Sequence, residues 1–319
     1  MLQFPDFEEK QILFIESFDT KNINFENENL VIKEDGNIKN KVSLYKIFTI
    51  FLIGETTLTS VLIRKFQDFG ITLVLLKQNF LPYLVIGNET EGNFLLRKKQ
   101  YEKTEDEMLH IAKEIVILKT KNQLSLLKGF REKDENIKKE ILQINEIIQK
   151  IPNSMNYESL LGYEGNVSKI FFGSYFLSIG WNKRAPRTKI DIQNLLLDIG
   201  YTYLFHFIEA LLRLYGFDNY YGVYHRVWYQ RKSLALDIME PFRCIIDKAL
   251  LKAYNLKQID KKDFTFRNGQ YELDWKDAKK YTKIFLIAIM DNKKEMFYFV
   301  KEYYKYFMKG RDEFPKFEI

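Results

Sequence analysis

The spacing of hydrophobic and polar positions changes near residue 87. Upstream, short runs of β-branched and aromatic residues alternate with polar, turn-rich pieces, which is typical of strands, and residues 56–66 fit one helix ending near Gly70. Downstream, apolar residues recur every three or four positions, which is typical of helices. The runs that we expect to form strands are residues 11–17, 29–35, 46–54, 71–76 and 83–87.

The downstream pattern predicts long helices over residues 101–150, 155–177, 189–216 and 233–255 and over the last 40 residues. Asn268-Gly269 lies between two alternating arms and predicts a two-residue hairpin. The polar, Gly-rich residues 87–94 are the candidate linker. We therefore expect an α+β protein with a small β-rich domain, residues 1–86, followed by a larger and mainly α-helical domain, residues 87–319.

The composition is that of an ordinary globular protein, with 46% hydrophobic and 29% charged residues. The single cysteine, Cys244, excludes an intrachain disulfide and a Cys-rich zinc site, and it favours a reducing compartment. The first ten residues are acidic where a signal peptide would be basic, and the longest apolar runs are too short for a bilayer. These features predict a cytoplasmic protein that does not associate with a membrane.

Basic charge is concentrated in the second part of the chain. Residues 1–86 hold 9 Lys and Arg against 11 Asp and Glu, whereas the whole chain has a net charge of +6. Basic residues gather in a Pro-containing loop and near three aromatic residues, and they could neutralise nucleic-acid phosphates or simply form a solvated surface. The candidate DNA contacts are Lys183, Arg184, Arg187, Lys189, Arg226 and Arg231.

Two carboxylates interrupt an otherwise apolar helical run. Asp237 and Glu240 share one helix face, and Pro241 cannot donate the next backbone hydrogen bond, so the helix should kink there. With His225 just upstream, the pair could hold a cation at the bend. For an arbitrary helix, however, a solvated stripe paired with nearby basic residues is the commoner arrangement.

Glu164 is a second anomaly, because it lies among small and apolar residues. A buried acid needs a partner. That partner could be Lys169 or a C-terminal arginine, or Glu164 could join His225 and Glu240 around one metal ion. Two carboxylates and one imidazole suit Mg²⁺ or Mn²⁺.

The order of these segments resembles the CRISPR-associated integrase family. The resemblance rests on Glu164-Gly165 within a helix, KRAP at 183–186, QNLLLDIGY at 193–201 and GVYHRVWYQRKSLALDIMEPFR at 222–243, and it extends over essentially the whole chain. It implies a small β-sandwich-like N-terminal domain followed by a helical catalytic domain.

The resemblance also implies a site and an activity. Glu164, His225 and Glu240 would ligate the metal, with Asp237 beside them as a further catalytic residue, and Glu240 stands where some relatives carry aspartate. The enzyme would insert prespacer DNA into a CRISPR array by attack of a 3′-hydroxyl on a repeat phosphodiester. Further implied features are a homodimer formed through the N-terminal domains and a small ferredoxin-like partner protein that bridges two dimers.

Two other functions remain open at this stage. A structure-specific endonuclease would use water in place of the 3′-hydroxyl with the same metal. A non-catalytic nucleic-acid scaffold would use the acidic residues only in structural ion pairs.

Overall fold

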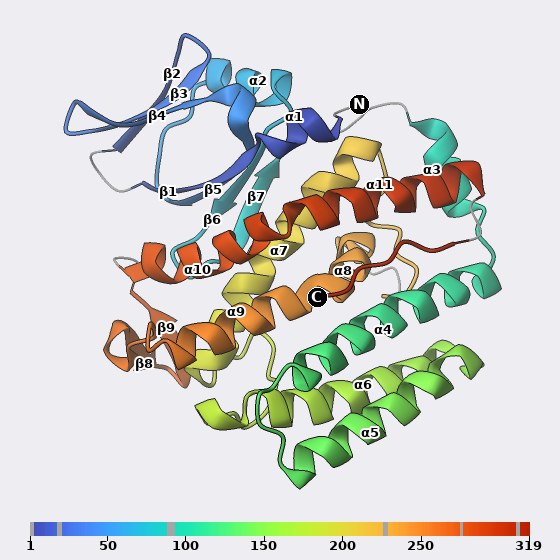
Figure 1. Ribbon diagram of the computed structural model, residues 1–319. Helices are drawn as coiled ribbons and strands as arrows, with labels where there is room; N and C mark the ends of the chain where they lie inside the picture. The colour runs from blue at the N-terminus through green and yellow to red at the C-terminus, as the bar shows by residue number, and fades with distance from the viewer. Residues whose placement is uncertain (1–2, 18–20, 88–92, 226–228, 275–276, 311–312) are drawn as a thin grey trace.

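The computed structural model describes residues 3–17, 21–87, 93–225, 229–274, 277–310 and 313–319 (Figure 1). Its first part contains two sheets. The larger sheet has the order β1-β5-β6-β7, in which the first three strands are parallel and β7 is antiparallel at the edge. Its strands are β1 (Gln11–Ser17), β5 (Ile47–Gly54), β6 (Thr72–Leu76) and β7 (Pro82–Ile86).

The second sheet is antiparallel and packs with helix α2 (Ser60–Asp68) against one face of the first. Alternate residues of β5 point to opposite faces: Ile50 and Leu52 join this inner core, whereas Phe51 and Ile53 join the core of the helical part. The larger sheet is therefore covered on both faces. The strands of the second sheet are β2 (Lys21–Glu26), β3 (Asn29–Glu34) and β4 (Asn37–Ser43).

Strands β2 and β4 were not predicted from the sequence. Both are rich in polar residues, and β4 is largely exposed at the sheet edge, so hydrophobic alternation is weak. The loops that join the three strands contain two residues each, and Asn27, Glu28, Asp35 and Gly36 all have positive φ, as type I′ hairpin turns require. Helix α2 begins later than expected, because Thr59 caps it by accepting a hydrogen bond from the Leu62 amide.

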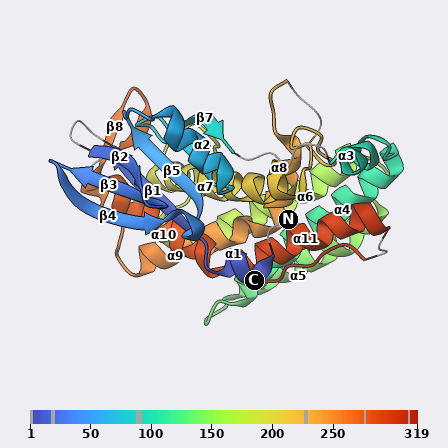
Figure 2. The same cartoon turned by 90° about the horizontal axis from the view of Figure 1, so that it is seen from above.

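The second part is mainly helical, with its helices arranged around α7, so the predicted α+β architecture is confirmed. Figure 2 shows the sheets at one end of the molecule and α3, α4 and α6 at the other. The helices are α3 (Phe94–Tyr101), α4 (Glu105–Lys128), α5 (Glu135–Lys150), α6 (Tyr157–Tyr175), α7 (Ile192–Tyr215), α8 (Ser233–Met239), α9 (Arg243–Asn255), α10 (Ala278–Asp291) and α11 (Lys293–Lys309), with a short α1 (Phe4–Glu8) at the start.

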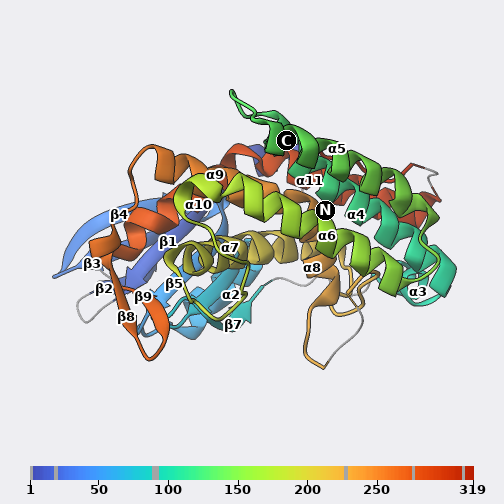
Figure 3. The ribbon, with the colours of Figure 1, turned by 90° about the horizontal axis from the view of Figure 1, so that it is seen from below.

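Two helical predictions need correction. Residues 101–150 are not helical throughout but end α3 and then form α4 and α5, which run side by side with α6 (Figure 3). The last helix ends at Lys309, and residues 313–319 return over α4 without regular structure. The predicted hairpin is confirmed as β8 (Phe264–Arg267) and β9 (Gln270–Leu273).

Helix α7 is long and apolar enough to meet the criteria for a membrane span, unlike any other described helix. The expectation that every apolar run is too short is therefore wrong for this segment. However, 83% of its most apolar window is buried inside the fold, where it packs against α8, α9, α10 and α11. Its hydropathy is that of a core helix.

Candidate active site

The kink predicted at Pro241 is present and places Glu240 at a bend. Helix α8 ends at Met239, one 3₁₀ turn spans Glu240–Phe242, and α9 begins at Arg243. Proline lacks the amide proton that would continue the α-helical hydrogen bonds. The turn packs against α4, so the Glu240 side chain points toward neighbouring helices.

Three helical segments bring Glu164, Glu240 and Lys119 together. The Lys119 ammonium, from α4, forms ion pairs with the carboxylates of Glu164 on α6 and Glu240, with a distance of 2.7 Å to Glu240 Oε2. The Arg243 guanidinium lies 3.0 Å from Glu240 Oε1. The Glu240 side chain is only 3% exposed, so two cations neutralise a carboxylate that is almost entirely shielded from water.

These contacts set the charge states at the bend. Burial favours protonated Glu240, but Arg243, Lys119 and His225 outweigh it and hold the pKa of this carboxyl at about 2. Burial likewise opposes a charge on Lys119, yet Glu240 and Glu164 raise the pKa of its ammonium above the usual value. Both groups are therefore charged at neutral pH.

His225 is held in place by Asp237. Nδ1 of the imidazole lies 2.6 Å from Asp237 Oδ1, and Nε2 lies 4.0 Å from Glu240 Oε1. Asp237 is fully buried and also accepts backbone hydrogen bonds from Val223, Tyr224 and His225. The structure thus places Asp237 behind the histidine rather than beside Glu164.

The side chains predicted as metal ligands lie near one another, but they are too far apart to bind one metal ion together. Among the described residues, no three acidic, histidine or cysteine side chains are close enough to hold a metal ion, because Lys119 lies between Glu164 and Glu240. The donor chemistry nevertheless fits a divalent cation, because both carboxylates already face a positive charge and that of Glu240 is almost entirely shielded from water. Two carboxylates and one imidazole nitrogen are suitable ligands for Mg²⁺ or Mn²⁺.

A pocket of about 520 Å³ extends from Glu164 along α6 to the basic loop. Of the predicted DNA contacts, Lys183 and Arg184 line it. Arg184 is also part of the fold, because its guanidinium lies 2.6 Å from Asp198 Oδ1 and 2.7 Å from Asn194 Oδ1. The pocket therefore places the Glu164 carboxylate beside a largely basic lining.

The remaining predicted DNA contacts lie apart from this pocket or outside the described residues. Arg187 is exposed, and its backbone amide donates to Asp198. Lys189 lines a different cavity, next to the β8–β9 hairpin. Arg231 is half-buried just before α8, and Arg226 falls outside the described residues.

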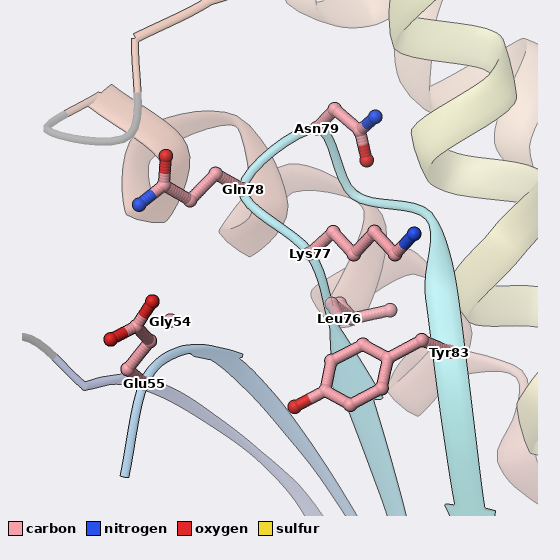
Figure 4. Close-up of a pocket in the computed structure, with 7 residues that line it drawn as sticks. All are labelled: Gly54, Glu55, Leu76, Lys77, Gln78, Asn79 and Tyr83. Atoms are coloured by element: carbon pink, nitrogen blue, oxygen red, sulfur yellow. The ribbon is translucent and has the colours of Figure 1, made fainter.

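Another cavity, of about 560 Å³, opens at the carboxyl ends of β5 and β6 (Figure 4). Glu55, Lys77 and Tyr83 line it with exposed side chains. It contains none of the residues predicted to act in catalysis, and Glu55 is its one acidic lining residue.

Comparison with known protein families identifies the family of this chain. The model of the CRISPR associated protein Cas1 family matches residues 13–286, which is well over half of the sequence. The chain belongs to the Cas1 family.

Individual relatives of this Cas1 chain cover most of its length. It is 28% identical over 242 residues to the CRISPR-associated endonuclease Cas1 1 of Thermodesulfovibrio yellowstonii, covering 73% of this chain and 75% of the relative. A casposase bound to an integration product superposes with a TM-score of 0.80 at 19% identity, over 97% of this chain and 94% of the casposase. A chain of a Cas6-RT-Cas1–Cas2 complex gives 0.79 at 21% identity, covering 96% of this chain and 36% of that longer one.

Sequence reasoning missed several residues of the candidate site. Lys119 was not singled out. Two buried polar residues, Asn122 and Gln123, follow it by three and four positions, and this pattern is unusual in a core helix. Arg243 was only one of the nearby basic residues that could pair with Asp237 and Glu240 on a solvated stripe. Tyr201 and Asp247 line the same pocket, and the Tyr201 hydroxyl donates a hydrogen bond to Asp247.

Proposed function

We propose that this Cas1 protein is a metal-dependent DNA integrase that inserts prespacer DNA into a CRISPR array. The observation that carries the proposal is the convergence of Glu164, Glu240 and His225 around one cation position, next to a pocket that Glu164 lines together with basic residues. The name of the Thermodesulfovibrio relative as an endonuclease and the integration product bound to the casposase support the same chemical class.

Glu164, Glu240 and His225 Nε2 would hold a Mg²⁺ or Mn²⁺ ion. When bound, the ion supplies Lewis-acid stabilisation of negative charge on the phosphate undergoing substitution. Asp237 would keep the Nδ1 proton of His225 in place, so that Nε2 presents its lone pair. Asp237 is therefore a positioning residue in this proposal.

The reaction requires no nucleophile from the protein. The 3′-hydroxyl oxygen of the prespacer would form a bond to the repeat phosphorus as the bond to the original 3′-oxygen breaks, and the proton passes overall from the attacking to the departing oxygen. Cys244 is buried, and burial raises the pKa of its thiol well above the usual value, so it is a poor nucleophile.

Basic side chains would bind the DNA backbone. Lys183 and Arg184, which line the same pocket as Glu164, would contact the reacting strands. Exposed or half-buried cations further out would contact flanking phosphates; we assign this role to Arg187, Lys189 and Arg231. We assign the same role to Arg226, which lies outside the described residues, from its place in the sequence alone.

The resemblance to the family implies an assembly. We propose a homodimer formed through residues 1–86, with a small ferredoxin-like protein bridging two dimers; the Cas1–Cas2 complex among the similar structures supports a CRISPR-associated partner. We also propose a cytoplasmic location, which the lone buried cysteine supports.

Strand transfer with purified protein tests the function. A labelled prespacer with a 3′-hydroxyl, a repeat-containing plasmid and Mn²⁺ should give covalent donor–plasmid product, and EDTA or Glu240→Ala should abolish it. Glu158→Ala, which removes an exposed acid from the same helix as Glu164, is the matched control and should retain activity.

A second donor separates integration from hydrolysis. A 3′-deoxy prespacer cannot attack, so an integrase should yield no joined product with it. Metal-dependent cutting of branched DNA that is indifferent to the donor's 3′ end would instead identify an endonuclease. Metal-independent DNA binding with no product of either kind would identify a scaffold.

A further inference from the structure

The Lys119 ammonium lies where the Glu164 and Glu240 carboxylates meet. It forms ion pairs with both, and its side chain is 11% exposed. A buried ion pair needs close geometry to offset the loss of hydration, and this lysine is held by carboxylates from two other segments of the chain. The position is the same one that the proposed metal ion would need.

Lys119 cannot share this position with a divalent cation. Both would require the same carboxylate oxygens, and their positive charges would repel each other at a few ångströms in a poorly hydrated site. Arg243 differs, because it approaches Glu240 from the Oε1 side and its guanidinium lies 4.8 Å from the centroid of the Tyr201 ring. Arg243 can therefore stay while Lys119 leaves.

The pocket beside Lys119 has room for its ammonium group to move away from the carboxylates. Lys119 lines the 520 Å³ pocket together with Gln123, one turn further along α4. The side-chain oxygen Oε1 of Gln123 is buried without a hydrogen-bond partner, so a residue that lines the pocket carries an unused acceptor. A lysine side chain has four rotatable bonds and can swing through such a distance.

We propose that Lys119 is a built-in competitor of the metal ion, which occupies the cation position in the metal-free protein and moves into the pocket when a divalent cation binds. This inference rests on the proposed metal site. The lysine would keep Glu164 and Glu240 paired and the fold stable before the metal arrives, at a cost in metal affinity. Removing its charge should therefore strengthen metal binding and weaken the metal-free fold.

Binding of Mn²⁺ tests the exchange without reference to DNA or catalysis. Free Mn²⁺ is measured by electron paramagnetic resonance during titration of the wild type and of Lys119→Met, Lys119→Gln and Lys119→Arg. We expect the two neutral variants to bind Mn²⁺ roughly tenfold more tightly or better, because an electrostatic interaction that shifts a pKa by one unit changes an affinity about tenfold. Lys119→Arg should not bind more tightly than the wild type.

Thermal unfolding gives a second readout. In EDTA the neutral variants should have a lower Tm than the wild type, and Mn²⁺ should raise their Tm by more than it raises that of the wild type. Lys119→Gln is included because its amide can still donate to a carboxylate and so preserve the fold. Lys169→Met, which removes an exposed cation from the same pocket, should leave both readouts near the wild-type values.

The outcomes separate the two proposals. If the wild type binds Mn²⁺ and the neutral variants bind it equally or more weakly, the exchange is wrong and the metal site stands. If neither the wild type nor any variant binds Mn²⁺, the proposed metal site fails, and the exchange fails with it.

Discussion

Nδ1 of His225 lies 2.6 Å from Asp237 Oδ1, and this contact determines which ring nitrogen faces Glu240. A carboxylate can only accept hydrogen bonds, so Nδ1 donates to Asp237 and Nε2 is the ring nitrogen that faces Glu240. Asp237 and Glu240 are three residues apart and contact opposite sides of the same ring: Asp237 holds Nδ1, and Glu240 faces Nε2.

The first prediction concerns Asp237. In Asp237→Asn the amide nitrogen would face backbone N–H groups that now donate to the carboxylate, so the loop that carries His225 should loosen. We expect Mn²⁺ affinity to fall about 10- to 100-fold and the free energy of unfolding to fall by about 1–3 kcal/mol. Asp291→Asn, at an exposed position, is the control. Unchanged Mn²⁺ affinity would show that His225 does not depend on Asp237.

The second prediction concerns Gly222. A Cβ atom at this position would lie 2.6 Å from Ser233 Cβ and 2.7 Å from Asp237 Oδ2, so Gly222→Ala must displace the Asp237 carboxylate or the start of α8. We expect the free energy of unfolding to fall by about 1–3 kcal/mol in urea titrations. Gly162→Ala on α6 meets nothing within 4 Å and should be neutral or stabilising. Equal stability of the two variants would refute the steric argument.

The third prediction is a pH dependence due to Asp247. Burial raises the pKa of this carboxyl from 3.8 to about 7, although the Tyr201 hydroxyl and the Arg243 and Arg184 guanidinium groups oppose the shift. The folded state therefore holds a proton that the unfolded state has lost, and stability decreases as pH rises between these two values. Above the folded pKa the full cost of the buried charge is present.

Asp247→Asn removes this titration. The stability of the variant relative to the wild type should increase with pH by up to about 1.4 kcal/mol for each pH unit between roughly pH 4 and 7, and then level off. Urea unfolding of both proteins at several pH values measures the difference, which cancels the contributions of other titrating groups. If the free energies of unfolding of the variant and the wild type change with pH in parallel, Asp247 has the same pKa in the folded and unfolded states.

The fourth prediction concerns Asn122, which links α4 to two distant segments. Its buried amide donates to the Pro241 and Phe317 carbonyls, and its oxygen accepts from the Ile319 amide. Asn122→Ala should lower the free energy of unfolding by about 2 kcal/mol, because buried polar groups lose their partners. Ser125→Ala, which removes one exposed hydrogen bond to Ile319, should change it little. A similar loss in both variants would argue against a special role for the amide.

Much of the fold could be predicted because the signals are local. The continuous apolar runs of β5 and β6 reflect the two buried faces of the sheet, and the break at Pro241 follows from proline stereochemistry. Strands β2 and β4 lacked this signal, since backbone pairing and positive-φ turns define them more than side-chain burial does.

The site was harder to predict because its contacts are between helices. Reasoning from the sequence offered Lys169 or a C-terminal arginine as the partner of Glu164, whereas the structure pairs it with Lys119, 45 residues upstream. Only the packing of α4 against α6 decides which lysine meets the acid. Reasoning from the residues offered Glu164, His225 and Glu240 as one metal-binding set beside the alternative of structural ion pairs, and the resemblance to the family favoured the metal-binding set.

The shared face of the larger sheet and α7 has a consequence for experiments on the first 86 residues. The ring of Phe51 lies 4.7 Å from that of Tyr203, centroid to centroid, within the same core that supports α8 and α9. Heating should therefore melt the sheet and the helices in one cooperative transition. A variant in the sheet that abolishes DNA joining could do so by lowering the melting temperature of the whole molecule, so its thermal stability should be measured before its loss of activity is attributed to a lost subunit contact.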